Sequence, residues 1–202
     1  MRKVSVFLFC VLCISFYVTP CFAEPFYVDH FEKVGNLLGG RTSVYQRAPS
    51  RATAATSDRE HYGPSGKALV IRYDKKNVGG PDDTGGWCGY YSLLKSGPKY
   101  LDATGFTNLI FWVKGEKGQE NFKIGLADKY WEQMGDSLKS EEISAYLPKN
   151  HITTEWQKAT VPLDVFFLDM KELASVAICF EGDCFPEGQG RGVVYIDEVA
   201  FE

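Results

Sequence analysis

Aromatic residues next to glycines are the part of this sequence best suited to ligand chemistry. Trp87, Tyr90 and Tyr91 follow two consecutive glycines, Gly85 and Gly86. Aromatic rings offer flat apolar surfaces, and glycines leave the backbone free of side chains that would obstruct a ligand. Such rings stack on the C–H faces of sugars, while planar polar groups at the rim bind the hydroxyls. We therefore treat the three rings as a candidate sugar platform, with packing over the ends of the fold as the alternative.

A second aromatic pair, Tyr130 and Trp131, directly follows Asp128 and Lys129. We expect this pair in a loop beyond a strand that covers residues 122–126. Two adjacent large rings in a polar loop are costly to leave exposed without a use. They are further candidates for ligand contact, again with packing as the alternative.

Three polar residues, Arg72, Lys123 and Asp128, occupy positions opposite the apolar residues of their expected strands. Side chains alternate between the two faces of a strand, so these residues lie on the face away from the core. That face is either solvent-exposed or a binding cleft, and both interpretations stay open at this point.

Catalytic motifs are hard to find in the chain. The three histidines, His30, His61 and His151, do not accompany any nucleophile motif, and the sequence has no phosphate-binding loop or zinc-protease helix. A glycosidase needs two carboxyl groups that face each other across a sugar. Glu141 and Glu142 are neighbours on one expected strand and point to opposite faces. We therefore expect a protein that is not an enzyme; a hydrolase would require facing carboxylates.

Short alternating segments must position all of these residues. Apolar and polar residues alternate over stretches of strand length bounded by turn residues, which predicts strands at 67–73, 87–94, 108–114, 122–126, 141–147, 156–163, 176–180 and 193–201. Residues 42–62 are polar and predict a long loop or a weak edge strand. Only residues 169–174 suit a helical turn. Strands without crossover helices predict an all-β, two-sheet antiparallel sandwich.

Several segments in a fixed order carry a family resemblance. They are Asp29-His30-Phe31-Glu32, Asn36-Leu37-Leu38-Gly39-Gly40, Gly66-Lys67-Ala68-Leu69, residues 85–91, 109–115, 122–126 and 152–158, and Tyr195-Ile196-Asp197-Glu198-Val199. The chain resembles galactose-binding-like jelly-roll carbohydrate-binding modules, near the family eleven type. It is also similar to the related fold of the complex I intermediate-associated protein of thirty kilodaltons. The resemblance implies sugar binding on a concave sheet face or at loop tips, and it makes Trp112 and Trp156 framework residues.

The same resemblance implies a structural calcium ion (Ca2+). It points to Glu32 near the N-terminus and Asp197 on the last strand, with Asp29 as a third ligand. Calcium prefers several hard oxygen ligands at short range. Ordinary surface carboxylates are the alternative, although Asp197 lies in an otherwise apolar strand, where a carboxylate needs a partner.

The first 23 residues have the layout of a secretory signal peptide. A positive start, Met1-Arg2-Lys3, precedes an apolar run to about Val18, and small residues Cys21 and Ala23 lie at the positions that a signal peptidase reads. The run is shorter than the roughly 20 residues that span a bilayer. We expect cleavage after about Ala23, a single domain over 24–202, and a secreted or periplasmic protein.

Three cysteines follow this segment: Cys88, Cys179 and Cys184. Export permits a disulfide, and the close spacing of Cys179 and Cys184 favours a loop staple between them, with a pairing of Cys88 left open. The net charge of -4 and the scattered basic residues argue against nucleic acid and against stable membrane insertion.

Together these features predict non-catalytic polysaccharide or oligosaccharide binding by an exported jelly-roll module. The alternative is a structural or assembly protein of the cell envelope that binds a protein partner through the same face.

Overall fold

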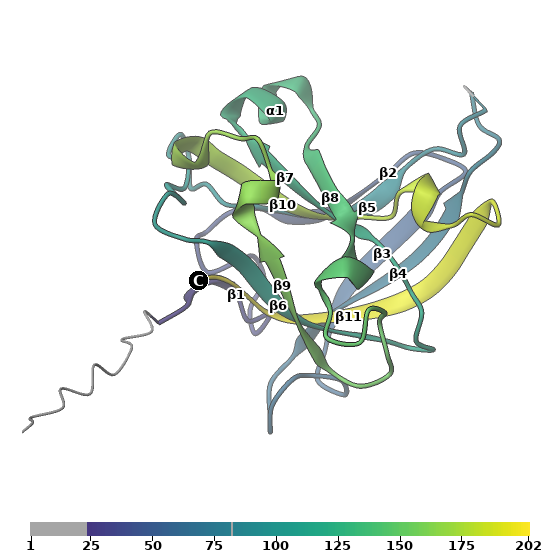
Figure 1. The fold of residues 1–202 in the computed structure, drawn as a ribbon, viewed down its shortest axis with the longest axis horizontal. Helices are drawn as coiled ribbons and strands as arrows, with labels where there is room; N and C mark the ends of the chain where they lie inside the picture. Colours follow the sequence, from purple (N-terminus) through teal and green to yellow (C-terminus); the bar gives the residue numbers. More distant parts are fainter. Residues whose placement is uncertain (1–23, 82) are drawn as a thin grey trace, which may run out of the picture.

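Two antiparallel sheets face each other in the computed structural model, which describes residues 24–81 and 83–202 (Figure 1). The six-stranded sheet has the order β3-β4-β11-β6-β9, with β1 paired to β11, and the five-stranded sheet has the order β2-β5-β10-β7-β8. The strands are β1 (Phe26–Asp29), β2 (Thr42–Gln46), β3 (Arg51–Ser57), β4 (Ala68–Lys76), β5 (Cys88–Leu93), β6 (Asn108–Gly115), β7 (Lys123–Asp128), β8 (Leu138–Glu142), β9 (Gln157–Pro162), β10 (Leu173–Cys179) and β11 (Gln189–Phe201). The expected all-β jelly-roll sandwich is confirmed.

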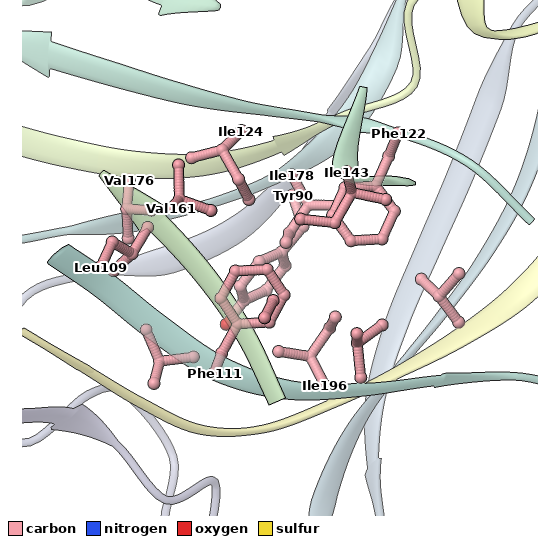
Figure 2. Close-up of a cluster of buried hydrophobic side chains, with 14 of the residues drawn as sticks. Tyr90, Leu109, Phe111, Phe122, Ile124, Ile143, Val161, Val176, Ile178 and Ile196 are labelled. Carbon is pink, nitrogen blue, oxygen red and sulfur yellow. The ribbon is translucent and has the colours of Figure 1, made fainter. Parts of the chain in front are cut away.

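The core lies between the two sheets and is built by the alternation seen in the sequence. Leu109, Phe111 and Val113 of β6 are buried in it, while Trp112 and Lys114, on the alternate positions, are only partly buried. Figure 2 shows Phe111 from the six-stranded sheet facing side chains from the five-stranded sheet. Burial of these large apolar side chains is the main stabilisation of such a sandwich.

Strands β2 and β3 occupy the segment for which the sequence predicts a loop or a weak edge strand. Both are edge strands, but β2 belongs to the five-stranded sheet and β3 to the six-stranded one. Edge strands have one neighbour and tolerate polar residues on their exposed side, so their alternation is weak. The short turn between Gln46 and Arg51 carries the chain from one sheet to the other.

A short helix is the main departure from the expected elements. Helix α1 (Lys129–Met134) contains Tyr130 and Trp131, for which the sequence predicts a loop. The Asp128 side chain caps its first turn, and Gly135 ends it in the left-handed conformation, with φ 72°. A helix of six residues is too short to show a period of 3.6 in the sequence.

Short 3-10 turns connect the remaining strands. They are η1 (Ile143–Tyr146), η2 (Leu163–Val165), η3 (Met170–Glu172) and η4 (Gly182–Cys184). The strand expected over 141–147 therefore ends at Glu142, and β10 begins at Leu173, inside the segment for which a helical turn is expected.

The expected disulfide is absent in the described residues, where Cys88, Cys179 and Cys184 are free and buried. Cys184 packs in the core between the sheets, as does Cys88. Cys179 lies on the outward side of β10, close to Tyr45 and Gly125. The staple prediction is therefore wrong, because Cys179 and Cys184 are directed to different sides of the sheet.

The predicted signal peptide, residues 1–23, lies outside the described residues. In the part of the chain that the structure describes, no helix has the length and apolar character required to cross a membrane.

Candidate functional site

The outward side of the five-stranded sheet collects most of the predicted platform residues, and we call it the platform face. Strand register places Tyr45, Gly89, Cys179 and Lys123 side by side in one row across β2, β5, β10 and β7. The next row on the same face is Ser43, Tyr91, Ala177, Gly125 and Lys139. Residues directly opposite each other in a sheet share a face, so the two rows form one continuous surface.

Small residues form the centre of the platform face. Gly89, Gly125 and Ala177 are adjacent in the two rows, and this allows larger side chains to lie flat over the sheet. A Cβ atom at Gly89 would collide with the Tyr45 hydroxyl, and one at Gly125 would collide with Ser137 Oγ. The Tyr45 ring therefore lies over Gly89, where its hydroxyl hydrogen-bonds Cys179 and burial raises its pKa above the ordinary value.

An aromatic group forms one side of this face. Trp87 is 45% exposed, and its ring centroid lies 5.8 Å from that of Tyr45. Tyr91, two positions beyond Gly89, is half-buried, and the Arg41 guanidinium lies 5.6 Å from its ring centroid. These rings, with a cation and hydroxyl groups at their edge, are the combination that sugar binding requires.

Charged residues form the opposite side of the face. Lys123 Nζ lies 2.6 Å from Asp183 Oδ2, and Lys139 Nζ lies 2.8 Å from Asp136 Oδ1. Both carboxylates are largely exposed, so they can accept hydrogen bonds from an incoming hydroxyl group while they hold the lysines.

Helix α1 stands at the far end of the face, where it contacts β7 and β10 (Figure 1). Glu132 holds it there by an ion pair with Lys95 Nζ at 2.6 Å and a hydrogen bond from the Tyr100 hydroxyl at 3.0 Å. Tyr130 is 62% exposed, and its ring meets that of Trp131 edge-on. A hollow of about 290 Å³ adjoins Tyr130.

Trp87 and Tyr91 thus share the platform face with Lys123, and Tyr130 and Trp131 border its end. Three other predicted residues lie elsewhere. Tyr90 is 7% exposed and packs in the core between the sheets, as Figure 2 shows, because it alternates with Tyr91.

Arg72 and Asp128 are the other two residues that do not join the platform face. Arg72 lies on the outward side of the six-stranded sheet, across the molecule. Asp128 is buried, and its carboxylate accepts hydrogen bonds from the backbone N–H groups of Trp131 and Asp169, both at 3.0 Å. Asp128 therefore fixes helix α1 and does not face a ligand.

The sequence interpretation missed Tyr45, which is central to the face. Tyr45 lies in the polar segment that predicts a long loop or a weak edge strand, and the order Ser43-Val44-Tyr45 contains one apolar residue between two outward ones. That brief alternation was the only signal of a strand there.

The framework tryptophans lie on the other sheet. Tyr62 stacks on Trp112 with ring centroids 3.7 Å apart, and Trp156 meets Tyr62 edge-on at 6.4 Å. Packing at the sheet surface thus accounts for both indole rings.

The three predicted calcium ligands each bond a backbone N–H group. Asp29 Oδ1 accepts from Phe31 N at 2.7 Å, Asp197 Oδ2 from Tyr62 N at 2.8 Å, and Glu32 Oε1 from Lys67 N at 2.7 Å. Burial raises the pKa of Asp29 and of Asp197 to about 6, because desolvation disfavours the charged form. Among residues 24–81 and 83–202 there is no group of three or more His, Cys, Asp or Glu side chains that could hold a metal ion. This donor set does not support the calcium prediction.

Comparison with known families decides the class of the protein. A family model described as carbohydrate binding domain 30 matches residues 39–202. The chain belongs to this family. No curated protein matches the chain.

Solved structures share the fold of this carbohydrate-binding domain. The family 11 carbohydrate-binding module from Clostridium thermocellum, in complex with a β-1,3-1,4-mixed-linked tetrasaccharide, is similar with a TM-score of 0.63 and 15% identity, over 88% of this chain and 94% of that chain. The family 30 module of the cellulosomal cellulase Cel9D-Cel44B of Clostridium thermocellum gives a TM-score of 0.54 and 19% identity, over 89% and 92% of the two chains. The predicted resemblance to carbohydrate-binding modules is confirmed.

Domains of this family are non-catalytic binding modules, so this carbohydrate-binding domain is not an enzyme. Its chemistry is recognition, which depends on rings, hydrogen-bonding groups and the shape of the surface.

Proposed function

We propose that this carbohydrate-binding domain binds a polysaccharide on the platform face, with Trp87 and Tyr91 as the stacking residues. The observation that carries the proposal is the exposed Trp87 ring beside Tyr45, on the same sheet face as Tyr91, where the centre of the face consists of small residues. A flat apolar ring with polar neighbours binds the C–H face of a pyranose and pairs its hydroxyls at the same time.

The dimensions of the face support an extended chain as ligand. Trp87 directly precedes β5, and Leu93 at the end of β5 is six residues further on, which corresponds to about 20 Å of extended chain. Tyr130 and Trp131 border the face beyond the Leu93 end of β5. A polysaccharide that runs along the strands would contact Trp87 first, then Tyr91, and the helix α1 aromatics last.

Calorimetric titration against a panel of β-glucans, xylans and mannans tests the proposal. We expect wild type to bind at least one neutral polysaccharide, and Trp87→Ala and Tyr91→Ala each to weaken that binding by about tenfold or more, as for central aromatic residues of other interfaces. Phe167→Ala is the matched control, because Phe167 is 91% exposed and belongs to neither row of the platform face.

Absence of binding to every polysaccharide of the panel would refute the proposal. Unchanged affinity in both platform variants, with Phe167→Ala also unchanged, would refute the assignment of the face.

We also propose that the domain acts outside the cytoplasm after removal of residues 1–23. The positive start, the apolar run and the small residues before Glu24 support this. Amino-terminal sequencing of the protein recovered from the periplasm or medium should begin at about Glu24. Retention of the full chain inside the cell would contradict export.

A further inference from the structure

The outward side of the six-stranded sheet carries a groove of about 370 Å³, on the opposite side of the sandwich from the platform face. Strands β3, β4 and β11 form its floor, and they lie side by side in Figure 1. The groove volume is within the roughly 300–1,000 Å³ of small-ligand clefts. Neither the platform residues nor helix α1 contribute to it.

Basic residues outnumber acidic residues in the lining, and we call this feature the basic groove. Strand register places Arg51, Asp74 and Arg191 in one row, and Thr53, Arg72 and Val193 in the next row on the same face. Lys117 follows β6 and lines the groove together with Glu116. Four basic residues thus line the groove against two acidic ones, although the whole chain has a net charge of -4.

Ion pairs inside the molecule neutralise only part of this charge. Asp74 binds Arg191 through Oδ2 at 2.6 Å and Lys76 through Oδ1 at 3.1 Å, so one carboxylate has two cations. In the described part of the chain, the Arg51, Arg72 and Lys117 side chains have no ion pair, and all three residues are exposed. Glu116 is the remaining acidic residue of the lining and reduces the positive charge without removing it.

The positions of the two unpaired arginines on neighbouring strands suit a ligand with more than one negative charge. Arg51 and Arg72 are diagonal neighbours on β3 and β4, which puts their Cα atoms about 7–8 Å apart. An arginine side chain can bind a carboxylate through two parallel hydrogen bonds, in a geometry that a lysine cannot reproduce. Thr53, in the same row as Arg72, adds a hydroxyl group for a neutral part of the ligand.

We propose that the basic groove is a second glycan site, specific for acidic sugars that carry carboxylates, such as the uronate units of a polysaccharide. This inference rests on the proposed function in that it takes the ligand to be a glycan; the site itself is separate from the platform face. The negative charge of the chain as a whole disfavours long polyanions such as nucleic acid, whereas a short charged sugar segment meets only the groove.

Titration of the full protein with a trimer of galacturonate tests the inference. We expect wild type to bind the trimer, with affinity that falls as salt rises, and to bind the methyl-esterified trimer much more weakly. The double variant Arg51→Gln and Arg72→Gln should lose about tenfold or more in affinity, because each charge-assisted bidentate contact is lost. Its melting temperature, measured in parallel, establishes that the fold is retained.

The matched control is the double variant Lys149→Gln and Lys171→Gln, which removes the same charge from exposed positions outside the groove. It should bind the trimer as wild type does. Equal losses in the two double variants would overturn the site in favour of a general charge effect. No binding of the trimer by wild type, equal binding of the ester, or tighter binding of a short DNA duplex than of the trimer would also overturn it.

A sulfated oligosaccharide is a further test ligand, and it should bind more weakly than the carboxylated trimer. Tighter binding of the sulfated oligosaccharide would overturn the preference for carboxylates. Tyr91→Ala distinguishes this inference from the proposed function. It should weaken binding of the neutral polysaccharide and leave the galacturonate trimer unaffected. If wild type binds the galacturonate trimer but no neutral polysaccharide, the proposed function of the platform face is refuted and the basic groove is not.

Discussion

Cys88, Cys179 and Cys184 show how burial sets the chemistry of single residues in this domain. Burial raises the pKa of Cys88 and Cys179 to about 11 and that of Cys184 to about 12. Cys179 lies beside the Tyr45 hydroxyl on the platform face, whereas Cys88 and Cys184 pack in the core. A thiol of high pKa is a poor nucleophile near neutral pH, so these three cysteines are structural.

This leads to a prediction about alkylation. At pH 8 a thiol with a pKa near 11 has on the order of a hundredfold less thiolate than an ordinary cysteine. Iodoacetamide should therefore modify the native protein far more slowly than the urea-unfolded protein, and the rate should rise as pH approaches the raised pKa. Peptide mapping without reductant, after unfolding, should find all three cysteines alkylated. A pair of peptides linked by a disulfide would contradict the free state of the three cysteines.

At the scale of elements, helix α1 depends on one buried carboxylate. Asp128 ends β7 and accepts hydrogen bonds from the backbone N–H groups of Trp131 and Asp169. It thereby joins a strand, the helix and the segment that leads to β10. The aromatic border of the platform face is held in place by this cap and by the Glu132 contacts with Lys95 and Tyr100.

We predict that Asp128→Ala lowers the free energy of unfolding by about 1–3 kcal/mol, because it removes a helix cap and leaves two backbone donors without a partner. Urea denaturation followed by fluorescence measures the change. Asp164→Ala is the control, since Asp164 is exposed, and it should change stability by less than about 0.5 kcal/mol. Equal stability of Asp128→Ala and wild type would show that the cap is dispensable.

At the scale of the whole molecule, the two sheets share one core but present different outward surfaces. The five-stranded sheet carries rings and small residues, and the six-stranded sheet carries the basic groove. Most connections pass from one sheet to the other, so neighbours in sequence become distant in space. Tyr45 of β2 and Arg51 of β3 are six residues apart, yet they lie on opposite sides of the sandwich. One domain can in this way present two separate surfaces to ligands.

The sequence by itself determined the strongly alternating strands of this domain and their inward residues. Alternation in residues 108–114 and 176–180 predicts which side chains enter the core, and the structure buries Leu109, Phe111 and Ile178 accordingly. The order of the family segments predicted the jelly roll and the carbohydrate-binding class. These features depend on local alternation or on the order of segments along the chain, and both can be read from the sequence.

Only the tertiary structure decided which outward residues meet. A period of two separates inward from outward residues on one strand, but it does not say to which of two sheets the strand belongs. Arg72 and Lys123 both point outward, and they lie on opposite sides of the molecule because β4 and β7 belong to different sheets. Tyr90 and Tyr91 are adjacent, and the pairing of β5 with β2 and β10 directs Tyr91 outward and Tyr90 into the core. Strand pairing is a contact between distant segments, so the platform face and the basic groove exist only once the sheets have formed.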